Sequence, residues 1–311
     1  SGQISIIILG IVGLLYSAKG GLQVSLRTDV FQMAVFLVVF SIAFIYMIFS
    51  SDFSFNSILQ STGVHDQAAR PGYVLIYVAL LQVFSYPAHD PVMMDRGFIA
   101  NQSKTNYSFI LAFLLSTFCI FGFGMFGIQA GLIGYDYENQ LLGTWQNMFG
   151  PGVYFFLICS LLVSAMSTLD SALASSARLV IDEFYIFKRS IKNGRIAMSI
   201  FMALGLLFTL FPSQSLFDAV AVTGTASMFL TPVMIVTFLG GNIPIWAYTI
   251  TWFFSMLGAF AYIFRDIETV TYLLPGLHKY DQLLSICLYI IVFGFLICFI
   301  GALSNRFLAK A

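Results

Sequence analysis

Apolar runs of about 20 residues recur along the whole chain, and this is the length that an α-helix needs to cross a bilayer. Of the 311 residues, 59% are hydrophobic and only 9% are charged, whereas soluble domains carry about 25% charged residues. A globule of this size cannot hide so much apolar surface from water. The sequence therefore predicts an all-α integral membrane protein, with the lipid bilayer as its surroundings.

Glycine and proline separate the apolar runs, which predict nine membrane helices. The expected spans are 3–17, 30–50, 73–98, 106–133, 152–184, 195–212, 216–239, 245–264 and 284–307. Since no linker or low-complexity tract interrupts this series, we expect a single membrane domain over 1–311. The chain opens on Ser1-Gly2-Gln3 and not on methionine, so we expect an N-terminally truncated part of a longer protein.

Lysine and arginine are unevenly distributed between the two sides of the predicted helix array. Eleven of the 14 lie on one side: Lys19, Arg27, Arg96, Lys104, Arg178, Lys188, Arg189, Lys192, Arg195, Arg306 and Lys310. The other three are Arg70, Arg265 and Lys279. The richer side is predicted to be cytoplasmic, which places the N-terminus of a multi-pass cell-membrane protein outside and its C-terminus inside. The net charge of zero gives no reason to expect a nucleic-acid partner.

Polar side chains recur every three or four residues inside the apolar run 152–184. The series is Ser164, Ser167, Ser171, Ser175, Arg178 and Asp182. On a helix this spacing makes one polar face, and Thr168 and Asp170 lie beside it. Such a face cannot lie against lipid. Clustered oxygen atoms suit a small hard cation, so the pattern predicts a cation site within the membrane.

The span 73–98 contains two prolines four residues apart, Pro87 and Pro91. Each removes a helical hydrogen bond and clashes with the preceding turn, so we expect an interrupted helix through residues 87–91. Tyr86, His89 and Asp90 lie at this interruption. Irregular backbone at membrane depth is tolerated where it lines a cavity, which favours a solute or gate site; the alternative is a proline kink whose polar groups satisfy one another.

A further polar motif precedes the span 30–50, where Gly20-Gly21-Leu22 is followed by Thr28-Asp29 and Gln32. The paired glycines let backbones approach closely. From the residues alone, one interpretation is a helix start, with Thr28 as the cap and Asp29 complementing the helix dipole.

These motifs together resemble the sodium:solute symporter family, which includes sodium–glucose, sodium–proline, sodium–sialic acid and sodium–iodide transporters. Gly20-Gly21-Leu22 with Thr28-Asp29 and Gln32 is similar to a junction of that family. The run from Met166 to Ser171 resembles its serine-rich sodium-site helix, and Asp95-Arg96 resembles the end of its broken helix. The resemblance implies a leucine-transporter-like fold of two inverted repeats. The first repeat would be partial, with its last two helices in 1–50; the second would be complete in 73–239; and 245–307 would be peripheral.

The resemblance also implies site residues. The main sodium site would take the hydroxyls of Ser167 and Thr168 and the carbonyl of Ser164. A second sodium site, present in only some members, would use Ser167 again with Asp29, Asp170 and Ser171.

On the solute side, the resemblance makes Tyr86 an aromatic inner gate. His89 and Asp90 would suit a solute with an amine or another polar charged group. The expected function is sodium-coupled symport of a small polar organic solute by alternating access, with Na⁺ as the bound ion.

Three other functions fit the residues less well. A proton-coupled transporter would use Asp29 and Asp170 as titrating groups, and a membrane sensor would couple this domain to a signalling module. A membrane-embedded enzyme would need His89, Asp90 and Asp95 as acid–base groups or ligands. Because only one of the three histidines lies at depth, we expect no enzymatic activity.

Overall fold

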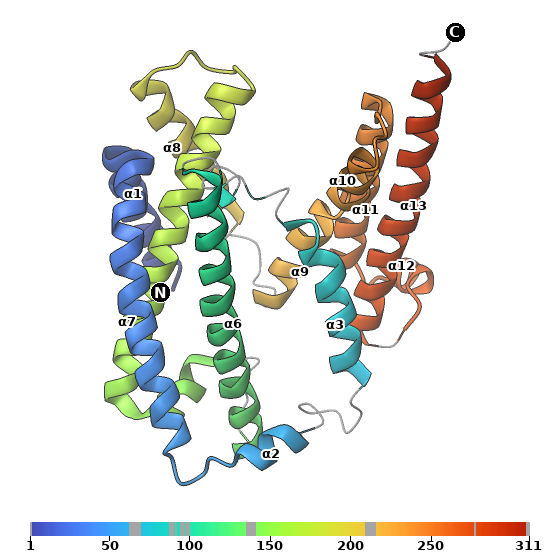
Figure 1. The fold of residues 1–311 in the computed structure, drawn as a ribbon. Helices are drawn as coiled ribbons and strands as arrows, with labels where there is room; N and C mark the ends of the chain where they lie inside the picture. Colours follow the sequence, from blue (N-terminus) through green and yellow to red (C-terminus); the bar gives the residue numbers. More distant parts are fainter. Residues whose placement is uncertain are drawn as a thin grey trace. The chain divides into compact units, whose positions relative to one another are not determined.

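A computed structural model describes residues 2–61, 70–86, 90, 92–93, 97, 100–134, 141–208, 216–276 and 278–308. Within these ranges all regular secondary structure is helical (Figure 1), which confirms the all-α prediction. The helices are α1 (Gly2–Ile48), α2 (Phe55–Gln60), α3 (Arg70–Val83), α6 (Gln102–Ile133), α7 (Leu141–Arg178), the π-helix η1 (Leu179–Glu183), α8 (Ile191–Phe208), α9 (Leu216–Ser227), α10 (Leu230–Phe238), α11 (Ile245–Ile263), α12 (Glu268–Leu273) and α13 (Lys279–Leu308).

Five helical segments in the described part of the chain are long and apolar enough to cross a membrane. They are Thr28–Ile48, Gln102–Ile133, Leu142–Glu183, Phe217–Phe238 and Lys279–Asn305. The other four predicted spans also contain helices, but these are shorter or more polar. The structure therefore supports a multi-pass membrane protein, and the count of nine spans stays a prediction.

The described helices group into two compact units. The first contains α1, α2, α6, α7, η1 and α8, and the second contains α3 and α9 to α13. Each unit has its own apolar core.

In the first unit, α1 bends back on itself. The Tyr16 hydroxyl donates a hydrogen bond to Thr28 Oγ1 at 2.5 Å. These residues are twelve positions apart, which is about 18 Å along a straight helix, so the chain must turn between them. The two predicted spans 3–17 and 30–50 thus correspond to two arms of one helical element.

The second arm of α1 packs against α6 and α7 through aromatic side chains. The core residues are Phe40, Ala43, Met47, Ile58, Met125, Phe126, Trp145, Phe149 and Leu157. Phe40 is fully buried, and its ring lies 4.8 Å from that of Phe123 and 5.7 Å from that of Phe126, between centroids. Dense aromatic packing of this kind fixes the register of α1 along its neighbours.

Helix α7, which contains most of the predicted polar face, is irregular at both ends. Gly150 has φ +67°, a left-handed conformation that glycine tolerates, and Pro151 follows it. The regular part therefore begins at Pro151, close to the predicted start at residue 152. At the other end α7 passes into the π-helix η1, a local widening that is frequent at functional sites.

The second unit contains the first part of the predicted span 73–98 as helix α3. Regular helix ends at Val83, before Pro87. Pro87 has no N–H with which to bond the carbonyl of Val83, its partner four residues back, and this explains the earlier end. Pro87, His89 and Pro91 lie outside the described residues, so the predicted conformation of 87–91 is not tested.

The predicted span 216–239 corresponds to one membrane-length segment, Phe217–Phe238, but its helix is not continuous. The structure has two helices, α9 and α10, with Met228 and Phe229 in a turn between them. Pro232 cannot donate to the Met228 carbonyl, which instead accepts from the Thr231 N–H at 3.0 Å. Regular helix thus ends about four residues before a proline in two places, at the end of α3 and at the end of α9.

We predict that Gly122→Ala destabilises the protein by about 1–3 kcal/mol. A Cβ at residue 122 would overlap the ring of Phe40, which cannot move because it is fully buried. Gly124→Ala is the matched control on the same helix, since no atom lies within 4 Å of its Cβ position. There we expect unchanged or slightly higher stability, because alanine favours helix by up to ~1 kcal/mol. Thermal unfolding in detergent measures both, and equal effects at the two sites would contradict the packing of α1 on α6.

Candidate functional site

The carboxylate of Asp29 connects α1 to the polar face of α7. Ser167 Oγ donates a short hydrogen bond to Asp29 Oδ1, and Ser171 Oγ lies 3.5 Å from Asp29 Oδ2. Asp29 is therefore more than a helix-start residue, since its side chain bonds to another helix. Three residues predicted from the motifs of two distant segments meet at one place in the first unit.

A second carboxylate joins this cluster through the same serine. Ser171 Oγ lies 3.3 Å from Asp170 Oδ1, and Asp170 is only 1% exposed. A hydroxyl has a single proton, so Ser171 can donate to only one of the two carboxylates at a time. We refer to Asp29, Ser167, Asp170 and Ser171 together as the carboxylate–serine cluster.

The cluster lies well inside the membrane-length part of α7. Ser167 is 16 residues after Pro151 and 11 before Arg178, which corresponds to about 24 Å and 16 Å of helix. Carboxylates are costly at such depth unless protein groups or ions surround them. The depth agrees with the prediction of a polar site within the bilayer.

Two predicted sodium ligands lie outside the cluster. The Thr168 hydroxyl donates to the Ser164 carbonyl of its own helix at 3.2 Å, and the Thr168 side chain is exposed in the described structure. These two oxygens are neighbours of each other, as the resemblance implies. They share no hydrogen bond with the carboxylate–serine cluster among the described contacts.

The polar face of α7 ends in a group of ion pairs at the junction of α7 and η1. Asp182 Oδ2 lies 3.8 Å from Arg178 Nε, and Asp182 Oδ1 lies 3.5 Å from Arg189 Nε. The Arg178 side chain is 48% exposed and that of Arg189 87%. Both ion pairs are therefore partly solvated. Ser175, one turn before Arg178, is buried and its hydroxyl has no hydrogen-bond partner among the described residues.

The residues predicted for the solute side belong to the second unit. Tyr86 follows the end of α3 and is half exposed, and the Asp90 N–H donates to the Tyr86 carbonyl at 3.2 Å. His89 lies outside the described residues, as do Asp95 and Arg96. The structure thus places Tyr86 and Asp90 on one short turn after the broken helix.

A partly buried polar contact that the sequence did not predict joins α3 to α9. Gln82 Nε2 donates to Thr225 Oγ1 at 3.0 Å and lies 3.2 Å from the Ala221 carbonyl. Gly224 permits this approach, because a Cβ there would lie 2.8 Å from Gln82 Oε1. The Ser255 hydroxyl of α11 donates to the Thr225 carbonyl at 2.6 Å. The sequence feature that could have indicated this contact is Gln82, an amide about one turn before Pro87 within an apolar run.

The second unit also contains a buried ion pair. Arg265 Nη2 lies 3.3 Å from Asp218 Oδ1, and the side chains are 13% and 10% exposed. The Tyr262 hydroxyl donates to the same oxygen at 2.8 Å, and the guanidinium lies 4.5 Å over the Tyr262 ring. The distribution of lysine and arginine predicts Arg265 on the side with fewer basic residues, and no local pattern links it to a residue 47 positions earlier.

Comparison with known proteins does not assign the chain to a family. No protein-family model matches the chain, and no curated protein matches it. The resemblance to sodium:solute symporters therefore stays a prediction from the motifs.

We predict that Arg265→Gln destabilises the second unit by about 3–5 kcal/mol, because it leaves the buried Asp218 charge without its guanidinium. Adding Asp218→Asn should restore part of the loss, since the buried charge is then removed as well. Arg189→Gln is the matched control: its side chain is 87% exposed beside Asp182, and such pairs contribute about 0–1 kcal/mol. Thermal unfolding compares the three variants, and a double variant no more stable than Arg265→Gln would contradict a coupled pair.

Proposed function

We propose that the chain is part of a sodium-coupled symporter that carries a small polar organic solute across the cell membrane by alternating access. The observation that supports this most is the carboxylate–serine cluster. It gathers two carboxylates and two hydroxyls from α1 and α7 at membrane depth. This is an oxygen-only set, and oxygen is the ligand that Na⁺, as a hard cation, prefers.

The hydroxyl groups make the cluster suited to an exchangeable ion. Ser167 and Ser171 donate to carboxylates in the structure, but each hydroxyl also has lone pairs. When a cation enters, a hydroxyl can rotate and present its oxygen as a ligand. Asp29 and Asp170 would balance the positive charge, which is necessary where water is scarce. We assign the second sodium site to this cluster, and the main site to Ser164, Ser167 and Thr168.

The proposed architecture is leucine-transporter-like, with the assignments 1–50, 73–239 and 245–307 given above. In this arrangement α7 is the sodium-site helix, and the interrupted helix after α3 is the broken helix of the second repeat. The N-terminus lies outside and the C-terminus in the cytoplasm. We assign solute contact and gating to Tyr86, His89 and Asp90.

Proton coupling is the second candidate, and one observation favours it. Asp29 and Asp170 approach the same Ser171 hydroxyl, and two neighbouring carboxylates can hold a proton between them. The two candidates differ in what drives uptake: a sodium gradient at constant pH, or a pH gradient without sodium.

We predict that Ser167→Ala, in the full-length protein reconstituted in vesicles, raises the sodium concentration for half-maximal uptake about tenfold. The change removes one ion ligand, and tenfold corresponds to about 1.4 kcal/mol. Ser160→Ala is the control on the same helix, because among the described residues the buried Ser160 hydroxyl bonds only to the Leu157 carbonyl. Thr168→Ala should act like Ser167→Ala. Unchanged sodium dependence in both variants would reject the sodium site.

Asp29→Asn should alter ion coupling far more than folding. The asparagine carbonyl can still accept the bond from Ser167, so we expect a stability change within about 1 kcal/mol. The loss of charge should reduce the number of sodium ions moved per solute, measured by parallel isotope fluxes. If sodium is irrelevant and the variant instead loses pH dependence, proton coupling replaces sodium coupling. If stoichiometry, sodium dependence and pH dependence all stay as in the wild type, Asp29 has only a structural role.

A further inference from the structure

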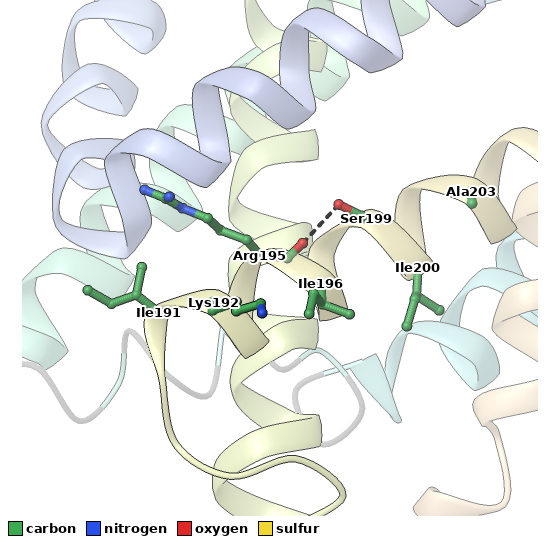
Figure 2. Close-up of a pocket in the computed structure, with 7 residues that line it drawn as sticks. All are labelled: Ile191, Lys192, Arg195, Ile196, Ser199, Ile200 and Ala203. Atoms are coloured by element: carbon green, nitrogen blue, oxygen red, sulfur yellow. Dashed lines mark hydrogen bonds between the residues drawn. The ribbon is translucent and has the colours of Figure 1, made fainter.

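One face of α8 forms a shallow groove of about 640 Å³ (Figure 2). Its lining residues follow two helical rows with a spacing of four: Ile191, Arg195, Ser199 and Ala203, and beside them Lys192, Ile196 and Ile200. The opposite face of α8 packs against α7 through Ala197, Met198 and Met202. The groove is therefore the outer face of a helix whose inner face is already occupied.

Positive charge is concentrated at one end of this groove. Lys192 and Arg195 lie in the first turns of α8, and Lys188 and Arg189 come just before the helix. Lys192 forms no hydrogen bond or ion pair with the described residues, and it is exposed. Arg195 Nε donates to the Ala18 carbonyl of α1 at 3.0 Å, which holds the guanidinium at the edge of the groove. The helix N-terminus adds a partial positive charge at the same end.

Beyond the basic end the groove is apolar except for Ser199, whose hydroxyl donates to the Arg195 carbonyl at 2.9 Å. Ile196 and Ile200 are 41% and 45% exposed and, with Ala203, continue the face away from the basic end. In Figure 2 the side chains of Lys192, Ile196 and Ile200 lie along the same side of the helix. From Lys192 to Ala203 the helix rises about 16 Å, which is close to half of the ~30 Å hydrocarbon thickness of a bilayer. A basic end followed by one leaflet depth of apolar surface matches the length and polarity of a phospholipid.

We propose that this face binds a phospholipid with an anionic headgroup. Its phosphate would lie at Lys192 and Arg195, and one acyl chain would follow Ile196, Ile200 and Ala203. Basic groups beside a membrane helix attract anionic headgroups, and a guanidinium matches the geometry of phosphate oxygens. This proposal rests on the membrane location of α8 that the proposed function includes, but not on sodium coupling. Lipid binding and sodium coupling can therefore be rejected separately.

The test is native mass spectrometry of the full-length protein, purified in a neutral detergent, with added palmitoyl-oleoyl phosphatidylglycerol or phosphatidylcholine. These lipids share their acyl chains and differ in headgroup charge. We expect preferential retention of phosphatidylglycerol. Lys192→Gln should weaken that retention about fivefold, the effect of roughly one basic group near an anionic headgroup. Lys104→Gln is the control, since Lys104 is an exposed lysine at the start of α6, away from this groove.

A second variant and a competitor separate the acyl-chain contact from the phosphate contact. Ile200→Ser changes an exposed side chain and should weaken retention of both lipids. Inorganic phosphate at the lipid concentration should not displace phosphatidylglycerol. Equal retention of the two lipids by the wild type, an equal loss in Lys104→Gln, or displacement by free phosphate would each overturn the proposal. So would disulfide-linked dimers of an Ile200→Cys variant, because a second copy of the chain would then cover the face.

Discussion

The hydrogen bonds between Asp29 and the serines of α7 are the interaction on which the first unit depends. A membrane helix gains little from apolar contact alone, because lipid is as apolar as its neighbours. Polar groups at depth are different, since each must find a partner inside the protein. The Ser167 hydroxyl donates to a carboxylate on α1, and the Ser171 hydroxyl lies within reach of that carboxylate and of Asp170. This pairing sets which part of α1 lies against which part of α7.

The aromatic core follows from that register. Asp29, Phe36, Phe40, Ala43 and Met47 are separated by seven, four, three and four residues, which places them on one helix face. When Asp29 lies beside Ser167, the same face carries Phe40 and Met47 toward the first part of α7 and toward α6. There the rings of Phe40, Phe123 and Phe126 lie within 4.8–5.7 Å of one another. One face of a single helix arm therefore has a polar end for the site and an apolar end for the core.

The sequence predicted the helical class and the polar face of α7, because these depend on local periodicity. It did not predict that α3 ends before Pro87 or that the span 216–239 divides into two helices. A proline disturbs the hydrogen bond four residues before itself, so helices end near Val83 and Met228, ahead of Pro87 and Pro232. Contacts between residues distant in sequence could not be predicted, since periodicity defines a helix face but not which residues lie against it. Only the family resemblance connected Asp29 to Ser167 in advance, while the contact of Gln82 with Thr225 had no such guide.

Asp218 and Asp29 differ in the chemistry of the groups beside them. Asp218 lies 3.3 Å from a guanidinium, which can only donate, and accepts a hydrogen bond from a tyrosine hydroxyl. The permanent positive charge of the guanidinium makes Asp218 a fixed ion pair that holds α9 to the end of α11. Asp29 accepts from serine hydroxyls, which are neutral and can rotate from donor to ligand without leaving their positions. An aspartate thus holds two helices together in one unit, where a guanidinium of the chain supplies the counter-charge. In the other unit, the two neutral serine hydroxyls beside Asp29 suit an exchangeable cation.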